Sequence, residues 1–147
     1  MDISFSPLDK ISSEIKEHHK HVKIAELNRK YHVKIAVNDV PFGWHNHPNS
    51  DEILIVLEGK IRVKFEDDIA HTLDVHDSLY IPKGTSHQTI PIGRAVNLVI
   101  EDIDTETVFE EKSLFGGAFF SPNPKCDSHS SFFTVFILLE RKKERDG

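Results

Sequence analysis

Two segments of the sequence carry residues that can bind a metal ion, and the first of them contains three. His45 and His47 are separated by one residue, and on a β-strand this spacing directs both imidazoles to the same face. Residues 48–51 are typical of a turn, so we expect the chain to reverse and to bring Glu52 back on a neighbouring strand beside the histidines. Glu52 precedes five apolar residues, where a buried carboxylate requires a compensating cation.

The second segment ends at His87. Pro82 restricts its own φ and Gly84 tolerates a positive φ, so residues 82–85 predict a tight turn that directs His87 inward. Three neutral imidazoles and one carboxylate suit Mn, Fe, Co, Ni, Cu or Zn, and the residues do not choose among them. An octahedral ion with these four ligands would keep two positions open for water or substrate, unlike a structural zinc site, which the protein fills.

The elements that would position these residues are mostly strands. A short helix is expected within residues 8–20, where apolar residues recur at helical spacing after Pro7. From Val22 onward apolar and polar residues alternate, as in strands with one buried face. We expect strands near residues 22–26, 31–37, 61–65, 78–81, 86–90 and 95–101, and turns at 58–60 and 67–68. Many short strands with little helix indicate a sandwich or a barrel.

We divide the chain into an N-terminal helix and strand arm (1–30), a barrel (31–111) and a C-terminal extension (112–147). Within the extension, residues 121–131 have loop composition, and the apolar run 132–139 suits either a buried strand or part of a helix that covers the barrel or a subunit contact. The charged residues near the C-terminus are interpreted as a solvated tail.

Length and composition exclude several classes of protein. The 147 residues suit one domain. A formal charge of -6 opposes binding to nucleic acid and to anionic membranes. The single cysteine, Cys126, cannot form an intrachain disulfide, and we interpret it as non-catalytic. The N-terminus does not have the pattern of a secretory signal, and no apolar stretch is long enough to span a bilayer, so we expect a cytoplasmic protein.

The two histidine segments resemble the paired motifs of the cupin superfamily: His-x-His, four residues, Glu, six residues, Gly, and then Pro-x-Gly-x-x-His. The matching positions are His45, His47, Glu52, Gly59, Pro82, Gly84 and His87, and the resemblance covers roughly residues 31–101. Asp39, His76 and Pro91 stand where the family has glycine, glycine and asparagine. The resemblance implies a double-stranded β-helix, or jelly-roll barrel, four metal ligands at His45, His47, Glu52 and His87, and a homodimer that exchanges N-terminal strands.

Aromatic residues and a cluster of histidines lie outside these two motifs. Phe42, Trp44 and Tyr80 are candidates to line a pocket near the metal, because the mouth of a small barrel commonly binds a ligand. Tyr80 is also the one candidate for an acid or base. His18, His19 and His21 lie among charged residues near the end of the expected helix and are interpreted as a solvated face.

Three functions remain open. A divalent ion with neutral histidines and one carboxylate can polarise a carbonyl group or stabilise an enolate, and a redox-active ion can activate oxygen, so an isomerase or a dioxygenase acting on a small molecule is the first hypothesis. The second is a non-enzymatic protein that binds or senses a small ligand. The third is a barrel that the metal only stabilises. This fold hosts many reactions, so the reaction is not defined by the site.

Overall fold

A computed structural model of the chain describes residues 2–112. One helix, α1 (Leu8–Glu14), precedes eight strands. The strands are β1 (His19–Leu27), β2 (Tyr31–Asn38), β3 (His45–Asn46), β4 (Glu52–Phe65), β5 (Ala70–Leu73), β6 (Ser78–Ile81), β7 (His87–Asp102) and β8 (Val108–Phe109). The predicted all-β barrel of the jelly-roll type with a short N-terminal helix is confirmed. The predicted features of residues 113–147, Cys126 among them, lie outside the described residues.

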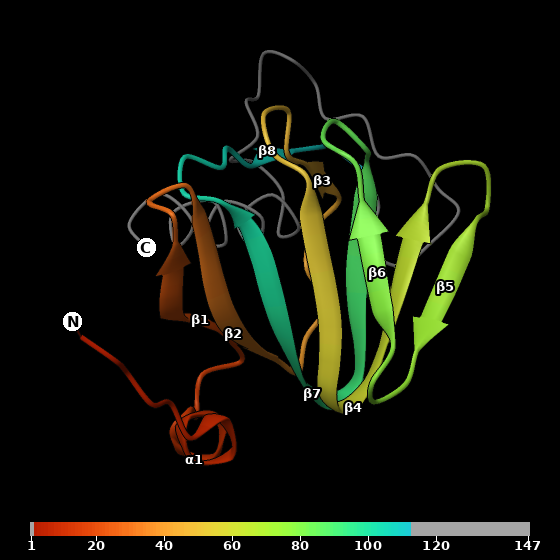
Figure 1. The fold of residues 1–147 in the computed structure, drawn as a ribbon. Coiled ribbons are helices and arrows are strands. Elements are labelled where there is room, and N and C mark those ends of the chain that lie inside the picture. The colour runs from red at the N-terminus through yellow and green to blue at the C-terminus, as the bar shows by residue number, and fades with distance from the viewer. Residues whose placement is uncertain (1, 113–147) are drawn as a thin grey trace.

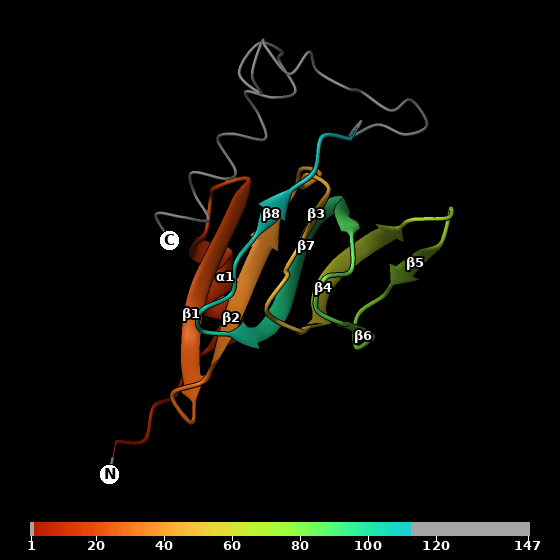
Figure 2. The same cartoon turned by 90° about the horizontal axis from the view of Figure 1, so that it is seen from above.

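The strands form one sheet that curls around a common interior (Figure 1). Hydrogen bonds connect the strands in the order β1-β2-β7-β3-β8, and β4 pairs with β5, β6 and β7. Seen from above, β1 and β2 lie on one side and β5 and β6 on the other, with β7 and β4 between them (Figure 2). The two long strands β4 and β7 therefore belong to both halves of the barrel.

A bulge at Gly59 allows β4 to take part in both halves. Before it, residues 52, 54 and 56 are buried, and after it residues 61 and 63 are buried, so the inward-facing positions change parity. Gly59 has a φ of 78°, and a Cβ there would meet the Arg94 backbone oxygen at 2.4 Å. The prediction of a turn at residues 58–60 is wrong, because the strand continues through this glycine.

The strand predictions were too short at two further places. The segments expected at 86–90 and 95–101 are one strand, β7, which contains Gly93 with a φ of 72°. The expected helix ends already at Glu14, and β1 begins at His19 instead of Val22. Asp67 and Asp68 form the predicted turn, with φ values of 60° and 58°. His76 stands where the family has glycine and indeed has a φ of 79°.

Apart from the pair Phe42 and Phe109, the described part of the interior contains two packed groups of apolar residues. The larger group comprises Ala36, Leu54, Val56, Ile61, Val63, Leu73, Ile81, Ala95 and Val99. The smaller group, Ile35, Val37 and Val96, is covered by Leu8 and Ile11 of α1 and by Ile15, which follows the helix. Because β1 pairs with β2 along its length, the N-terminal segment is hydrogen-bonded into the sheet. Within residues 2–112, no helix is long and apolar enough to cross a membrane.

Candidate metal centre

The four predicted ligands come from three strand ends. His45 is the first residue of β3 and lies opposite His87, the first residue of β7. His47 follows β3 directly, and Glu52 begins β4. The predicted pairing of the histidine strand with the glutamate strand is wrong: β3 pairs with β7 and β8, whereas β4 pairs with β5, β6 and β7. The curl of the sheet, not a hairpin, brings Glu52 to the histidines.

The four side chains form one buried group. All four are at most 7% exposed. One nitrogen of each of His45, His47 and His87 lies within 4.8 Å of the others. The Glu52 Oε2 atom is 2.9 Å from His47 Nε2, and its Oε1 atom is 4.0 Å from His87 Nε2. This group of histidines and a glutamate could hold a metal ion.

The backbone orients each imidazole so that Nε2 faces the group. The Nδ1–H groups of His45, His47 and His87 donate to the carbonyl oxygens of Gly43, Glu106 and Thr85, at 2.7, 3.0 and 2.8 Å respectively. The buried Nε2 atom of His87 has no hydrogen-bond partner among the described residues. Histidine ligands of metals commonly donate their second ring nitrogen to a carbonyl or carboxylate in this way. The residues therefore fit a metal ion.

His47 and Glu52 form an ion pair. Burial favours neutral His47, but the hydrogen bond and charge of Glu52 outweigh it and raise the pKa of His47 to about 9. Burial likewise acts to raise the pKa of Glu52, and His47 overcomes this effect to lower it to about 2. A metal cation would replace the His47 proton as the partner of the carboxylate.

The two other imidazoles are held neutral. Burial lowers the pKa of His45 well below its ordinary value, and neighbouring His87 and His47 add to this effect. Burial also lowers the pKa of His87, although Glu52 acts in the opposite direction. Neutral imidazoles have the lone pair that metal coordination requires, so these two residues need lose no proton.

A second buried carboxylate lies beside the group. Glu101 on β7 is opposite Glu52 in the β4–β7 ladder, and its carboxylate lies within 4.8 Å of the ligand atoms of His47 and Glu52. Burial and the charge of Glu52 raise the pKa of Glu101. The ammonium group of Lys34 compensates its charge at 2.5 Å. No local sequence pattern indicates Glu101, because its place depends on the register of β4 and β7.

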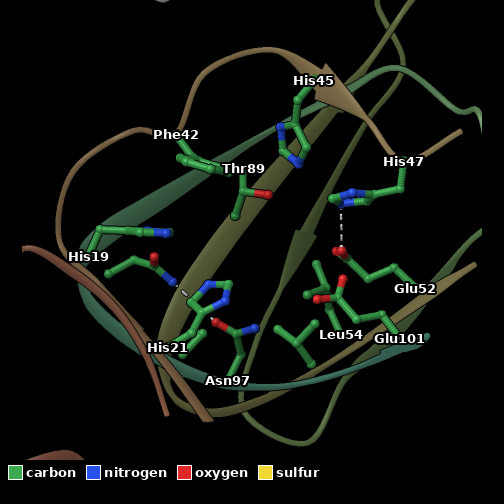
Figure 3. A pocket seen from close by; sticks show the side chains of 13 residues that line it. His19, His21, Phe42, His45, His47, Glu52, Leu54, Thr89, Asn97 and Glu101 are labelled. Atoms are coloured by element: carbon green, nitrogen blue, oxygen red, sulfur yellow. Dashed lines mark hydrogen bonds and ion pairs between the residues drawn. The ribbon is translucent and has the colours of Figure 1, made fainter. Parts of the chain in front are cut away.

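The group opens into a cavity of about 440 Å³, part of which is open to solvent. Figure 3 shows His45, His47 and Glu52 at one end of it. Of the three predicted pocket residues, Phe42 lines the cavity, whereas Trp44 and Tyr80 are absent from its described lining. Trp44 instead packs under the Lys112 ammonium, 4.6 Å from the ring centroid. Tyr80 is 54% exposed and donates its hydroxyl hydrogen to Asp51 at 2.9 Å.

Two histidines interpreted as solvated line this cavity instead. His19 is only 7% exposed and lies opposite the metal-binding group with His21 (Figure 3). The interpretation is wrong for these two residues and correct for His18, whose side chain is 76% exposed. The error arose from the helix prediction, which ended too late. The spacing of His19 and His21 on a strand, two residues apart as in His45 and His47, was the signal that could have identified them.

A network behind the metal-binding group connects the segments that carry its histidines. Glu110 accepts hydrogen bonds from Asn46, which lies between His45 and His47, at 3.2 Å and from Ser86, which precedes His87, at 2.6 Å. Lys112 lies 2.8 Å from the same carboxylate. One side chain thus holds both segments.

Both the sequence and the fold of this chain are similar to those of known proteins. A family model of the cupin domain matches residues 31–101. The Bacillus subtilis protein YdbB is 44% identical over 102 residues, which are 69% of this chain and 89% of YdbB. The chain belongs to the cupin superfamily.

Solved structures agree with this assignment. A cupin-2 domain protein from Shewanella frigidimarina is 32% identical, with a TM-score of 0.61, and the match covers 67% of this chain and 93% of that one. A Klebsiella pneumoniae protein with a double-stranded β-helix domain is 15% identical, with a TM-score of 0.62, over 74% of this chain and 92% of that one. At this identity the second match shows the fold alone.

Proposed function

We propose that this cupin is an enzyme that acts on a small molecule with one divalent transition metal held by His45, His47, Glu52 and His87. One observation carries the proposal. Three buried imidazoles, each with Nδ1–H donated to a backbone carbonyl, surround the Glu52 carboxylate, which lines the end of a cavity. A merely structural metal site has no need of a polar cavity beside it.

The bound metal would supply Lewis-acid chemistry, as in an isomerase, or oxygen activation, as in a dioxygenase. The side chains of the chain itself have separate tasks. His45 and His87 are neutral and oriented before any ligand arrives, so little reorganisation is needed. Lys34 neutralises Glu101, which prevents a second full negative charge from repelling an anionic substrate. The buried position of the group limits the access of water.

Elemental analysis of protein purified without an affinity tag tests whether a metal is bound. The identity of the metal distinguishes Lewis-acid chemistry from oxygen activation. We expect about one equivalent of a transition metal for each chain. A redox-active metal with oxygen uptake would support the dioxygenase, and a redox-inert metal with turnover of enolisable substrates would support the isomerase. Protein that contains no transition metal and binds none on addition would contradict the proposal.

Removal of the metal by a chelator separates catalysis from the two other roles. An enzyme loses turnover and regains it when the metal returns. A ligand-binding cupin binds its ligand without converting it, in the presence of metal. A barrel that the metal only stabilises shows a large fall in Tm with no change in small-molecule binding.

The proposal includes a homodimer in the cytoplasm. The exposed apolar side chains of Ile3 and Phe5, 84% and 88% exposed, support an intermolecular contact by the N-terminal segment. Light scattering should give twice the mass of the chain, and a variant that lacks residues 2–7 should give the monomer mass. A monomer at all concentrations would contradict the dimer, and cell fractionation tests the location.

A further inference from the structure

The cavity has a second polar wall, opposite the metal-binding group, that the proposed metal site does not use. It is formed by His19 and His21 on β1 (Figure 3). The His19 ring stacks on Phe42 with centroids 4.5 Å apart and planes at 12°, and the His21 ring lies 4.9 Å from the His19 ring. The stacking fixes the His19 ring at the cavity wall. Imidazole nitrogens can donate or accept hydrogen bonds there.

The register of the strands adds two amides to this wall. His21 is opposite Ala36 on β2, and Ala36 is opposite Asn97 on β7. The small side chain of Ala36 leaves room between the larger polar ones. Asn38, opposite His19, donates its side-chain N–H to the Asn97 side-chain oxygen at 3.3 Å. The wall thus consists of two imidazoles and two amides on three neighbouring strands.

The polarity of the cavity changes in order along β4 and β7. Glu52 and Glu101 form one cross-strand pair at the metal end, and Leu54 and Val99, two residues further along, form the next. Asn97 is the next inward-facing residue of β7. A distance of four strand residues, about 13 Å between Cα atoms, therefore separates the carboxylates from the amide wall. The cavity lining is charged at the metal end and aliphatic in the middle. At the opposite end it is polar, and the amides there carry no charge.

The net charge at the metal end of the cavity determines which chemical group of a ligand would bind there. A divalent cation together with Glu52 has one net positive charge, since Lys34 offsets Glu101. That end suits a carboxylate or another anionic oxygen. The opposite wall offers hydrogen-bonding groups to a second polar function, and the aliphatic side chains between them suit a short hydrocarbon chain.

We infer that the cavity binds a short-chain carboxylic acid with a second oxygen function, the carboxylate at the metal end and the other oxygen at His19 and His21. The inference rests on the proposed metal site and specifies its substrate class. It makes His19 and His21 specificity-determining residues.

Three four-carbon acids test the inference with the metal-loaded full chain. Succinate, 4-hydroxybutyrate and butyrate share a carboxylate and differ at the far end, so the comparison isolates the second polar group. By calorimetry we expect succinate and 4-hydroxybutyrate to bind about 10-fold more tightly than butyrate, as one or two additional hydrogen bonds allow. The inference would be overturned if neither succinate nor 4-hydroxybutyrate bound more tightly than butyrate.

Variants then test the residues. The double variant His19→Phe/His21→Phe keeps rings in the wall but removes their hydrogen-bonding nitrogens. It should lose the preference for the polar acids while its metal content and its affinity for butyrate stay unchanged. His18→Phe, in the same segment but exposed, should retain the preference. If the double variant does not fold, His21→Phe alone should reduce it, because His21 is only half-buried.

The outcomes separate this inference from the metal proposal. A wild-type protein that takes up metal but binds the three acids equally refutes the substrate class and leaves the metal site intact. A double variant that keeps the preference refutes the role of the histidines. A wild-type protein that binds no transition metal refutes the proposed function, and the inference falls with it.

Discussion

The chain contains two His-x-His segments that face one cavity, and their surroundings differ. At His45 and His47 the ring Nδ1 atoms donate to backbone carbonyls and a buried carboxylate lies 2.9 Å from one Nε2 atom. At His19 and His21 the rings contact Phe42 and each other, and amides are their neighbours. Spacing on a strand brings two imidazoles to one face in both segments. The carboxylate and the carbonyls are what distinguish a site for a cation.

The largest contrast is expected between matched alanine variants of the two segments. His47→Ala removes a proposed ligand and leaves Glu52 buried without its ion pair, so metal affinity should fall by at least about 100-fold. His21→Ala removes an imidazole that lies away from the carboxylate, and its metal affinity should stay within about 2-fold of the wild type. Titration with metal in competition with a chelator measures both. Equal losses would show that the two segments share one ion.

Gly59→Ala separates loss of fold from loss of metal. The added Cβ would lie 2.4 Å from the Arg94 backbone oxygen at a φ of 78°, so we expect the free energy of unfolding to fall by about 3 kcal/mol. Gly93→Ala is the matched control, because its φ is 72° but nothing lies within 4 Å of its Cβ position. It should cost only about 1 kcal/mol. Denaturant titration measures both variants, and the folded fraction of each should still bind one metal.

Glu110→Gln tests the network that holds the first segment to His87. The substitution weakens the hydrogen bonds to Asn46 and Ser86, so metal affinity should fall by up to about 10-fold. Glu66→Gln is the control, because Glu66 also pairs with Lys112, at 2.6 Å. An unchanged affinity in Glu110→Gln would show that the backbone alone orients the ligands.

The same variant has an expected pH dependence. Burial acts to raise the pKa of Glu110, but its bonds to Lys112, Ser86 and Asn46 outweigh burial and lower it. A carboxyl whose pKa is lower in the folded state stabilises the fold above its unfolded pKa and loses this effect as the pH falls through its folded pKa. The wild type should therefore exceed Glu110→Gln in stability near pH 7, and the difference should shrink toward about pH 3.

The smallest effect is expected at the third histidine of the N-terminal group. The His18 side chain is 76% exposed, and its Nδ1 atom lies 2.8 Å from the carboxylate of Asp39, whose side chain is 38% exposed. His18→Ala should change the free energy of unfolding by less than about 0.5 kcal/mol and leave metal binding unaltered. A large loss of metal in this variant would show that the ion binds at the N-terminal histidines and would contradict the proposed site.

The sequence predicted what depends on local spacing and missed what depends on register. The i, i+2 histidines and the turn before His87 follow from residues close in sequence. Glu101 and Asn97 reach the cavity through pairing of strands far apart in the chain, which no local pattern contains. Gly59 was identified as part of the motif but assigned to a turn, because a glycine with flanking polar residues suits a turn and a bulge alike. His19 and His21 were missed because the helix was expected to reach residue 20, so their spacing on a strand was overlooked.

The curl of the β4–β7 ladder has a consequence for stability. Glu52 and the partner of His87, Phe65, stand at opposite ends of that ladder, thirteen residues apart. In a flat sheet they would be about 43 Å from each other, yet the Glu52 and His87 side chains approach to 4.0 Å. A metal held by both would act as a cross-link between the two ends of one ladder. Like a disulfide, it would restrict the unfolded chain by closing a loop of about 35 residues between its ligands.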